Sequence, residues 1–387
     1  MRRISLNDFM AAGLLFWGIP AVLVAGPAVL LYTLAAVLPV WLFRLRNEAA
    51  LAPPEQRFSA TTGALLAAFA LIYLLWDAIF GQQFWRANML LFGAEATSHL
   101  VEQTVESMGQ GGGAAFLFYN ILFLFPFAMI DVARQLSGFI RIALWTIAAL
   151  FILYEMGSGR AFLLFSVLCI VLGQTSSWRR RGLAAALGLA AFIAASSLRG
   201  DLASSQNPLF QEFLAPFVNL ALFTHSSCGS APWYSFIGEF LKKFVPAFLF
   251  PKAVFSFNAE MSLCIYPSDP NLTNGVSVFT WMGEIFYYHP SLVTAVIAGL
   301  ILGALGRAVD CLLIRSNLQT CRYMAGFLCF LLPRSRTQDI FTFFLAQLFF
   351  LIICWPALST LARSLRRFLI APQPAQVACG PGSNGAR

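Results

Sequence analysis

Long apolar stretches separated by short segments that contain arginine dominate this chain and leave few folds open to it. A bilayer crossing needs roughly 20 apolar residues, and about ten stretches approach that length. They are 8–25, 27–44, 59–80, 114–131, 139–156, 159–175, 183–198, 290–309, 320–333 and 338–361. The chain is 59% apolar and 11% charged, with a mean hydropathy of +0.74. We therefore predict an all-α polytopic membrane protein with about ten transmembrane helices.

The arginines are divided unequally between the two sides of these predicted crossings. With the amino terminus inside, most of the 22 fall in internal segments: Arg2, Arg3, Arg44, Arg46, Arg57, Arg134, Arg141, Arg179, Arg180, Arg181, Arg307, Arg315, Arg363, Arg366, Arg367 and Arg387. This is the positive-inside pattern, and it predicts that both termini are cytoplasmic. It also explains the net charge of +8 without nucleic acid, because the basic residues alternate with spans and form no patch.

The predicted spans divide the chain into four parts. Residues 1–198 hold seven spans and a short external segment at 81–113, and residues 199–289 form a large external segment. Residues 290–361 hold the C-terminal spans, and residues 362–387 are a cytoplasmic tail. Within the large external segment, apolar residues recur at helical spacing over 236–249. This spacing predicts an amphipathic helix that lies at the membrane surface or packs on the spans.

The eight cysteines are scattered along the chain and show no zinc-binding spacing. Only Cys228 and Cys264 share the large external segment. A disulfide between these two is permitted in an oxidising compartment such as the periplasm. We expect neither a metal nor a cofactor.

A few arginines fall on the external side, against the general trend: Arg86, Arg160, Arg199, Arg334 and Arg336. Arg86 lies beside Trp85 and is interpreted as an anchor at the membrane interface. Arg334 and Arg336 form a pair of external positive charges, and Asp339 can neutralise only one of the two. A charge placed against the topological trend needs a compensating partner, so these arginines are candidates for binding an anion.

Two of the external arginines follow or precede spans directly. Arg160 ends a tight hairpin, Glu155-Met-Gly-Ser-Gly-Arg160, and opens the next span. A guanidinium beside the free N–H groups of a helix start suits phosphate, although an ion pair with Glu155 is the simpler alternative. Arg199 follows a span, where either Asp201 or an anionic ligand can balance its charge.

Acid–base candidates also lie in the external part of the chain. His225 follows an apolar stretch, and an imidazole exchanges protons near neutral pH, although a surface or core-capping histidine is the more common case. Glu284 lies in an apolar, aromatic stretch that leads into the span at 290–309. A carboxylate is costly there unless it pairs with an external arginine or acts as a base. Glu212 is a lesser candidate.

The order of these segments resembles a known family. A Gly-Ser-Gly-Arg160 hairpin, an external Arg199 and a Pro246…Pro251-Lys252 stretch precede Gly283-Glu284-Ile-Phe-Tyr287. A glycine-rich span follows, with Gly299, Gly303 and Gly306. Over roughly residues 140–310 this order is similar to that of the Wzy-type O-antigen or exopolysaccharide polymerases of bacteria. The usual aromatic-glycine pair after the Glu stretch is replaced here by Tyr287-Tyr-His289-Pro290.

The resemblance implies an inner-membrane glycosyltransferase of the GT-C architecture, with its active site facing the periplasm. Such enzymes transfer a growing glycan from undecaprenyl diphosphate to the non-reducing end of an incoming lipid-linked repeat unit. The implied partners are the undecaprenyl-diphosphate-linked oligosaccharide, membrane lipids and a chain-length regulator, and no nucleic acid. No cofactor or metal is implied.

The chemistry of this reaction assigns roles to the candidate residues. External arginines can stabilise the diphosphate leaving group as its charge develops: Arg160, Arg199, Arg334 and Arg336, of which the first two are assigned a catalytic role. Either Glu284 or His225 can take the proton from the attacking sugar hydroxyl, and the sequence leaves this choice open. The other candidates for substrate binding are Glu212, Trp233, Tyr234 and Tyr287, with the aromatic rings stacking on sugars.

Two other functions remain open from the sequence. An O-antigen ligase shares the architecture and the donor but uses lipid A–core as acceptor, and its essential histidine in a large external loop corresponds in type to His225. A polysaccharide transporter or flippase would need cationic residues facing a central cavity and two similar halves. The chain has no recognisable internal repeat, which favours the enzyme over the transporter.

Overall fold

The computed structural model describes the helical parts of the chain and their connections. It describes residues 5–44, 58–80, 124–156, 166–171, 281–288, 290–334 and 337–369, with a few more between 182 and 234. These residues contain helices and no strand. Three helical stretches are long and apolar enough to cross a membrane: Leu6–Ala25, Leu292–Arg315 and Phe343–Phe368. The prediction of an α-helical membrane protein is therefore confirmed at this level.

Most of the described helices start within two residues of a predicted span, but the helix that begins at Phe125 does not start near 114 as the predicted span 114–131 did. The N-terminal helices are α1 (Leu6–Gly18), α2 (Ala21–Ala25), α3 (Ala28–Leu42) and α4 (Ala60–Phe80), followed by α7 (Phe125–Ala133) and α8 (Gly138–Met156). The C-terminal ones are η5 (Gly283–Tyr288), α14 (Leu292–Arg315), α15 (Gln319–Leu331), η6 (Leu332–Arg334), α16 (Thr337–Phe349), η7 (Phe350–Cys354) and α17 (Trp355–Leu369). The predicted span 8–25 is divided into α1 and α2 at Pro20, whose ring cannot donate a helical hydrogen bond.

Two helices run further than the sequence predicted. The expected span 290–309 continues to Arg315, and α14 then ends where Asn317 takes a positive φ of 54°. The N–H of Leu318 bonds to Leu313 O at 3.1 Å, which closes the helix end. The tail expected from residue 362 begins as helix, because α17 continues to Leu369.

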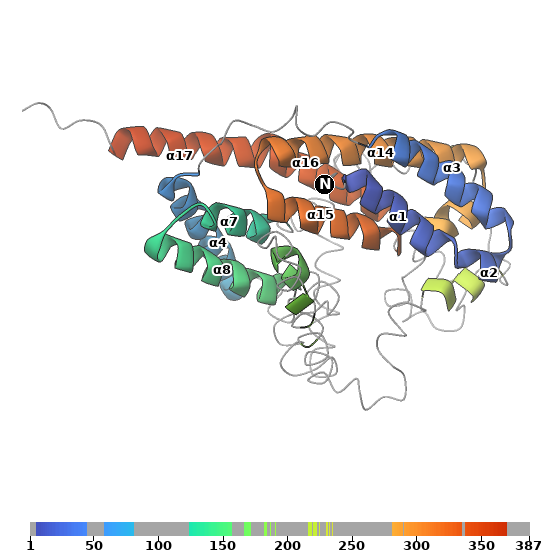
Figure 1. Ribbon diagram of the computed structural model, residues 1–387, viewed down its shortest axis with the longest axis horizontal. Coiled ribbons are helices and arrows are strands. Elements are labelled where there is room, and N and C mark those ends of the chain that lie inside the picture. Colours follow the sequence, from blue (N-terminus) through green and yellow to red (C-terminus); the bar gives the residue numbers. More distant parts are fainter. Residues whose placement is uncertain are drawn as a thin grey trace, which may run out of the picture.

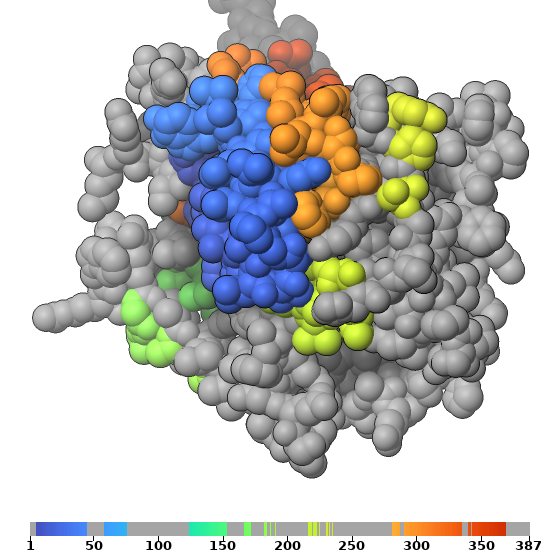
Figure 2. All heavy atoms as spheres, turned by 90° about the vertical axis from the view of Figure 1, so that its right-hand side faces the viewer, coloured from blue at the N-terminus to red at the C-terminus, as the bar shows by residue number. Residues whose placement is uncertain are grey.

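The central part of the fold pairs N-terminal helices with C-terminal ones (Figure 1). Helix α3 lies along α14, and α1 lies along α15, each pair running in the same direction. Figure 2 shows the blue N-terminal helices and the orange C-terminal helices side by side on one face. Helices near both ends of the chain therefore pack into one bundle, through contacts between residues that are far apart in the sequence.

Glycines permit the close packing of α14 on α3. A Cβ on Gly299 would collide with the backbone carbonyl of Ala36, and a Cβ on Gly303 would come within 2.9 Å of the Phe43 ring. These two residues are four positions apart, the spacing of the small-xxx-small motif that brings membrane helices together. The glycine-rich span noted in the sequence is thus a helix-packing surface.

A second group of helices, α4, α7 and α8, packs beside the first (Figure 1). The rings of Tyr73 on α4 and Phe151 on α8 stack with centroids 5.4 Å apart. Phe58, just before α4, contacts Trp355 of α17 edge to face at 5.7 Å. This contact joins the second group to the C-terminal helix.

Large apolar side chains are exposed along the outward faces of several helices. On α3, Leu31 is 61% exposed and Leu38 59%, and on α4, Ile72 is 65% exposed. Polar side chains such as Asn7 and Thr33 are buried in the bundle instead. An apolar outer surface around a core that contains polar groups is suited to contact with lipid.

Candidate functional site

Glu284 is the candidate catalytic residue that the structure describes most fully. Its side chain is completely buried, and it lies in the π-helical turn η5, between Gly283 and Tyr288. A π-helical turn inserts an extra residue and widens the helix locally, and such turns occur frequently at functional sites. Keeping a carboxylate out of water is costly, so a buried one is a functional candidate in its own right.

Contacts with α3 hold this turn in place. The rings of Phe286 and Tyr32 meet edge to face with centroids 4.8 Å apart. The hydroxyl of Thr33 donates to Val29 O at 2.9 Å, and the same oxygen lies 3.7 Å from the sulfur of Met282. Glu284 is thus positioned by aromatic and polar contacts made by its sequence neighbours.

Trp281 adds an unusual polar group close to Glu284 in sequence. Its side chain is 1% exposed, and its indole N–H has no hydrogen-bond partner among the residues that the structure describes. A buried donor without a partner costs about 1–3 kcal/mol. Because Trp281 lies about one helical turn before Glu284, a donor and a carboxylate occur together on one short helical segment.

Arg334 lies at the same end of the bundle as Glu284. It ends η6, which follows α15 and packs beside α1. The indole of Trp17 on α1 donates to Phe330 O on α15 at 3.1 Å, and Gly18 packs on Thr33, the neighbour of Met282. A continuous set of contacts therefore connects the start of η6 with η5.

The large segment 199–289 reaches this end of the bundle as well. The rings of Phe217 and Trp17 stack with centroids 5.9 Å apart, and Leu220 is fully buried. Tyr234, a predicted sugar-binding residue, is 63% exposed. Tyr287 belongs to η5 by its backbone.

The other predicted site residues lie outside the described part of the chain: Arg160, Arg199, Glu212, His225, Trp233 and Arg336. The same holds for Cys228, Cys264 and the amphipathic stretch 236–249. Among the described residues, no three His, Cys, Asp or Glu side chains are grouped so as to hold a metal ion. Of the predicted site residues, the structure therefore describes Glu284, Arg334, Tyr234 and the backbone of Tyr287.

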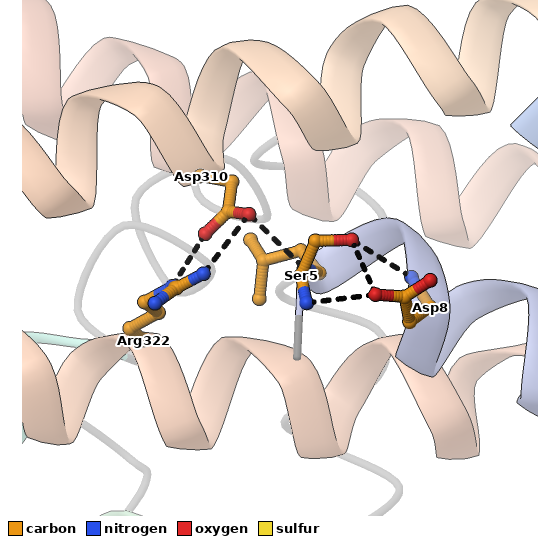
Figure 3. Close-up of polar contacts among 5 residues, drawn as sticks. Ser5, Asp8, Asp310 and Arg322 are labelled. Carbon is orange, nitrogen blue, oxygen red and sulfur yellow. Dashed lines mark hydrogen bonds and ion pairs between the residues drawn. The ribbon is translucent and has the colours of Figure 1, made fainter. Parts of the chain in front are cut away.

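A second polar cluster, which the sequence did not indicate, lies at the opposite end of α1 (Figure 3). The carboxylate of Asp310 on α14 accepts from Arg322 Nε at 2.6 Å and from the backbone N–H of Leu6 at 3.2 Å. Ser5 and Asp8 form a capping box at the same helix start, with Ser5 N donating to Asp8 Oδ2 at 3.0 Å. The cluster joins the start of α1 to α14 and α15.

A third buried carboxylate caps α15. Asp131 of α7 accepts from the Thr320 hydroxyl at 2.6 Å, from Thr320 N at 2.8 Å and from Cys321 N at 3.2 Å. These are the N–H groups that a helix start leaves without intrahelical partners. Asp131 and Asp310 thus both accept backbone N–H groups at helix starts, whereas Glu284 lies within the turn η5.

No protein-family model, no curated protein and no solved structure matches this chain.

Proposed function

We propose that this protein polymerises undecaprenyl-diphosphate-linked oligosaccharide repeat units in O-antigen or exopolysaccharide biosynthesis, as a GT-C glycosyltransferase of the bacterial inner membrane. The observation that carries the proposal is the complete burial of the Glu284 carboxylate within a π-helical turn, at the bundle end where Arg334 lies. The sequence assigns this end to the periplasmic face.

In the proposed reaction, the bond between the anomeric carbon of the growing glycan and the diphosphate oxygen breaks. A hydroxyl at the non-reducing end of the incoming repeat unit forms the new glycosidic bond. Its proton passes to the Glu284 carboxylate, and undecaprenyl diphosphate leaves with the electron pair of the broken bond. His225 is the alternative proton acceptor.

Arginines supply the electrostatic part of this proposal. The diphosphate gains negative charge as it leaves, and guanidinium groups can bind its oxygens in a bidentate fashion. Four arginines are assigned this role by their positions in the sequence: Arg160, Arg199, Arg334 and Arg336. For Arg334 there is further support, because it lies at the same end of the bundle as Glu284. The buried N–H of Trp281 is suited to donate to a sugar hydroxyl.

Deleting the gene in its host and resolving the surface polysaccharide on a gel tests the proposal. A polymerase predicts that the ladder of chain lengths collapses to a single repeat unit attached to its acceptor. Loss of all attached repeats with accumulation of lipid-linked polymer would point to the ligase. An unchanged ladder would contradict both.

A further inference from the structure

The C-terminal helix α17 is amphipathic, and its apolar face is only partly covered by the rest of the protein. Trp355 and Ala362 are buried, and Trp355 contacts Phe58. Further along the apolar face, Leu361 is 52% exposed and Phe368 is 82% exposed. Figure 1 shows α17 continuing past the ends of α1 and α15.

The opposite face of α17 is basic. Arg363, Arg366 and Arg367 are all exposed, and Arg363 donates within its own helix, to Ser359 O at 3.3 Å and to the Thr360 hydroxyl at 3.2 Å. The sequence contains no Asp or Glu from residue 340 to residue 387. This end of the chain therefore carries positive charge with no acidic residue nearby in sequence.

The position of the arginines relative to the bilayer follows from the length of the last apolar run. Residues 340–362 contain no charged residue and number 23, which is enough for a helix to cross the roughly 30 Å hydrocarbon core. Arg363 is the first charge after this run. The last two turns of α17 thus begin where the helix leaves the hydrocarbon and enters the headgroup region.

Two features within the apolar run, before Arg363, allow the helix to bend. The π-helical turn η7 (Phe350–Cys354) directly precedes α17, and Pro356 occupies its first turn. Both features interrupt regular helical hydrogen bonding and are common causes of helix bends. The segment after them can therefore adopt its own angle to the membrane.

From these observations we propose that the end of α17 lies in the membrane interface and binds anionic phospholipid headgroups through Arg363, Arg366 and Arg367. Leu361 and Phe368 then insert among the acyl chains beside it. A basic amphipathic helix with exposed aromatic and aliphatic residues is the pattern of an interfacial helix. This proposal does not depend on the glycosyltransferase reaction.

Charge and position favour lipid over a protein partner as the occupant of this surface. The arginines follow the apolar run directly, so lipid headgroups lie beside them. Anionic headgroups complement a face that holds three arginines and no acidic residue. A second copy of this chain would bring the same positive face and would be repelled.

Photo-crosslinking of the full-length protein tests the proposal. Phe368 is replaced by benzoylphenylalanine, and the protein is reconstituted in nanodiscs of phosphatidylcholine with a minority of phosphatidylglycerol. After irradiation, the adducts on the intact protein are identified by mass spectrometry. We expect phosphatidylglycerol adducts to exceed the proportion of this lipid in the bilayer by roughly fivefold or more, the effect of one arginine at an anionic surface.

Charge-matched variants separate local binding from a general effect of net charge. Arg363→Gln/Arg366→Gln/Arg367→Gln should return the adducts to the bulk lipid proportion. Arg141→Gln/Arg307→Gln/Arg315→Gln removes the same charge from exposed arginines on other helices and should leave the enrichment intact. Bulk lipid proportions in the unsubstituted protein, crosslinks between two copies, or an absence of lipid adducts would each overturn the proposal.

Discussion

Arg322 and Asp310 form an ion pair, with 2.6 Å between Arg322 Nε and Asp310 Oδ1, and both side chains are at most 8% exposed. The same carboxylate accepts the N–H of Leu6, so one acidic group joins the start of α1 to α14 and α15. Asn7 adds a hydrogen bond from its Nδ2 to Gly303 O at 2.9 Å. The start of the chain is thereby fixed to its C-terminal helices.

Breaking this ion pair should strongly destabilise the protein. Arg322→Gln or Asp310→Asn leaves a buried charge without its partner, which typically costs about 3–5 kcal/mol. The measurement is the thermal unfolding midpoint of the purified protein in detergent, with Arg315→Gln, an exposed arginine of α14, as the control. Asp310→Leu/Arg322→Met should lose less stability than the two single changes together, because no charge is left unpaired. If the stability loss of the double variant equalled the sum of the two single losses, the ion pair would be contradicted.

Removing the cap on α15 should destabilise the protein less than breaking the Arg322–Asp310 ion pair. Asp131→Ala removes the acceptor for the first N–H groups of the helix, which costs about 1–2 kcal/mol. Thr320→Ser keeps the hydroxyl that donates to Asp131 and should be nearly neutral. Thermal unfolding of both variants measures the difference. An equal loss of stability in Asp131→Ala and Thr320→Ser would mean that the carboxylate and the hydroxyl do not act together as a helix cap.

Close packing of α14 on α3 makes Gly299 sensitive to substitution. Gly299→Ala places a Cβ against the backbone carbonyl of Ala36, so the two helices must move apart. We expect a loss of about 1–3 kcal/mol, the usual cost of overpacking. Gly182→Ala is the matched control, because a Cβ there would meet no atom of the described residues within 4 Å. Equal stability of the two variants would show that α3 and α14 do not pack this closely.

The sequence predicted the helical class, the starts of several helices such as α3, α8 and α14, and the glycines of α14, but not the start of α7 at Phe125. The predicted features follow from apolar run length and from small residues at regular spacing, which are local properties. The partners of Asp310 and Asp131 were not predicted, because Arg322 and Thr320 belong to other helices and only the packing brings them together. The π-helical geometry around Glu284 was also missed, since a single inserted residue leaves no pattern in apolar periodicity.

The external arginines should be required for activity and dispensable for insertion. Arg160→Ala and Arg199→Ala each remove a cation assigned to the diphosphate, and activity should fall by about 100-fold or more. Arg86→Ala is the control, because Arg86 is interpreted as an interfacial anchor. Ladder formation in the complemented deletion strain, at matched protein abundance, reports the effect. Near-normal ladders in both arginine variants would contradict diphosphate binding at these positions.

The most direct test of the central claim uses purified protein in liposomes with a single undecaprenyl-diphosphate-linked repeat unit as both donor and acceptor. The account predicts a ladder of lipid-linked oligomers and release of undecaprenyl diphosphate in equal number to the bonds formed. Glu284→Gln should slow this reaction by about 100-fold or more, as loss of a general base does. Glu239→Gln, which changes a carboxylate of the predicted amphipathic stretch 236–249 to which no role is assigned, should not slow it. A ladder of normal rate from Glu284→Gln would exclude Glu284 as the proton acceptor, and no ladder from the unsubstituted protein would contradict the polymerase itself.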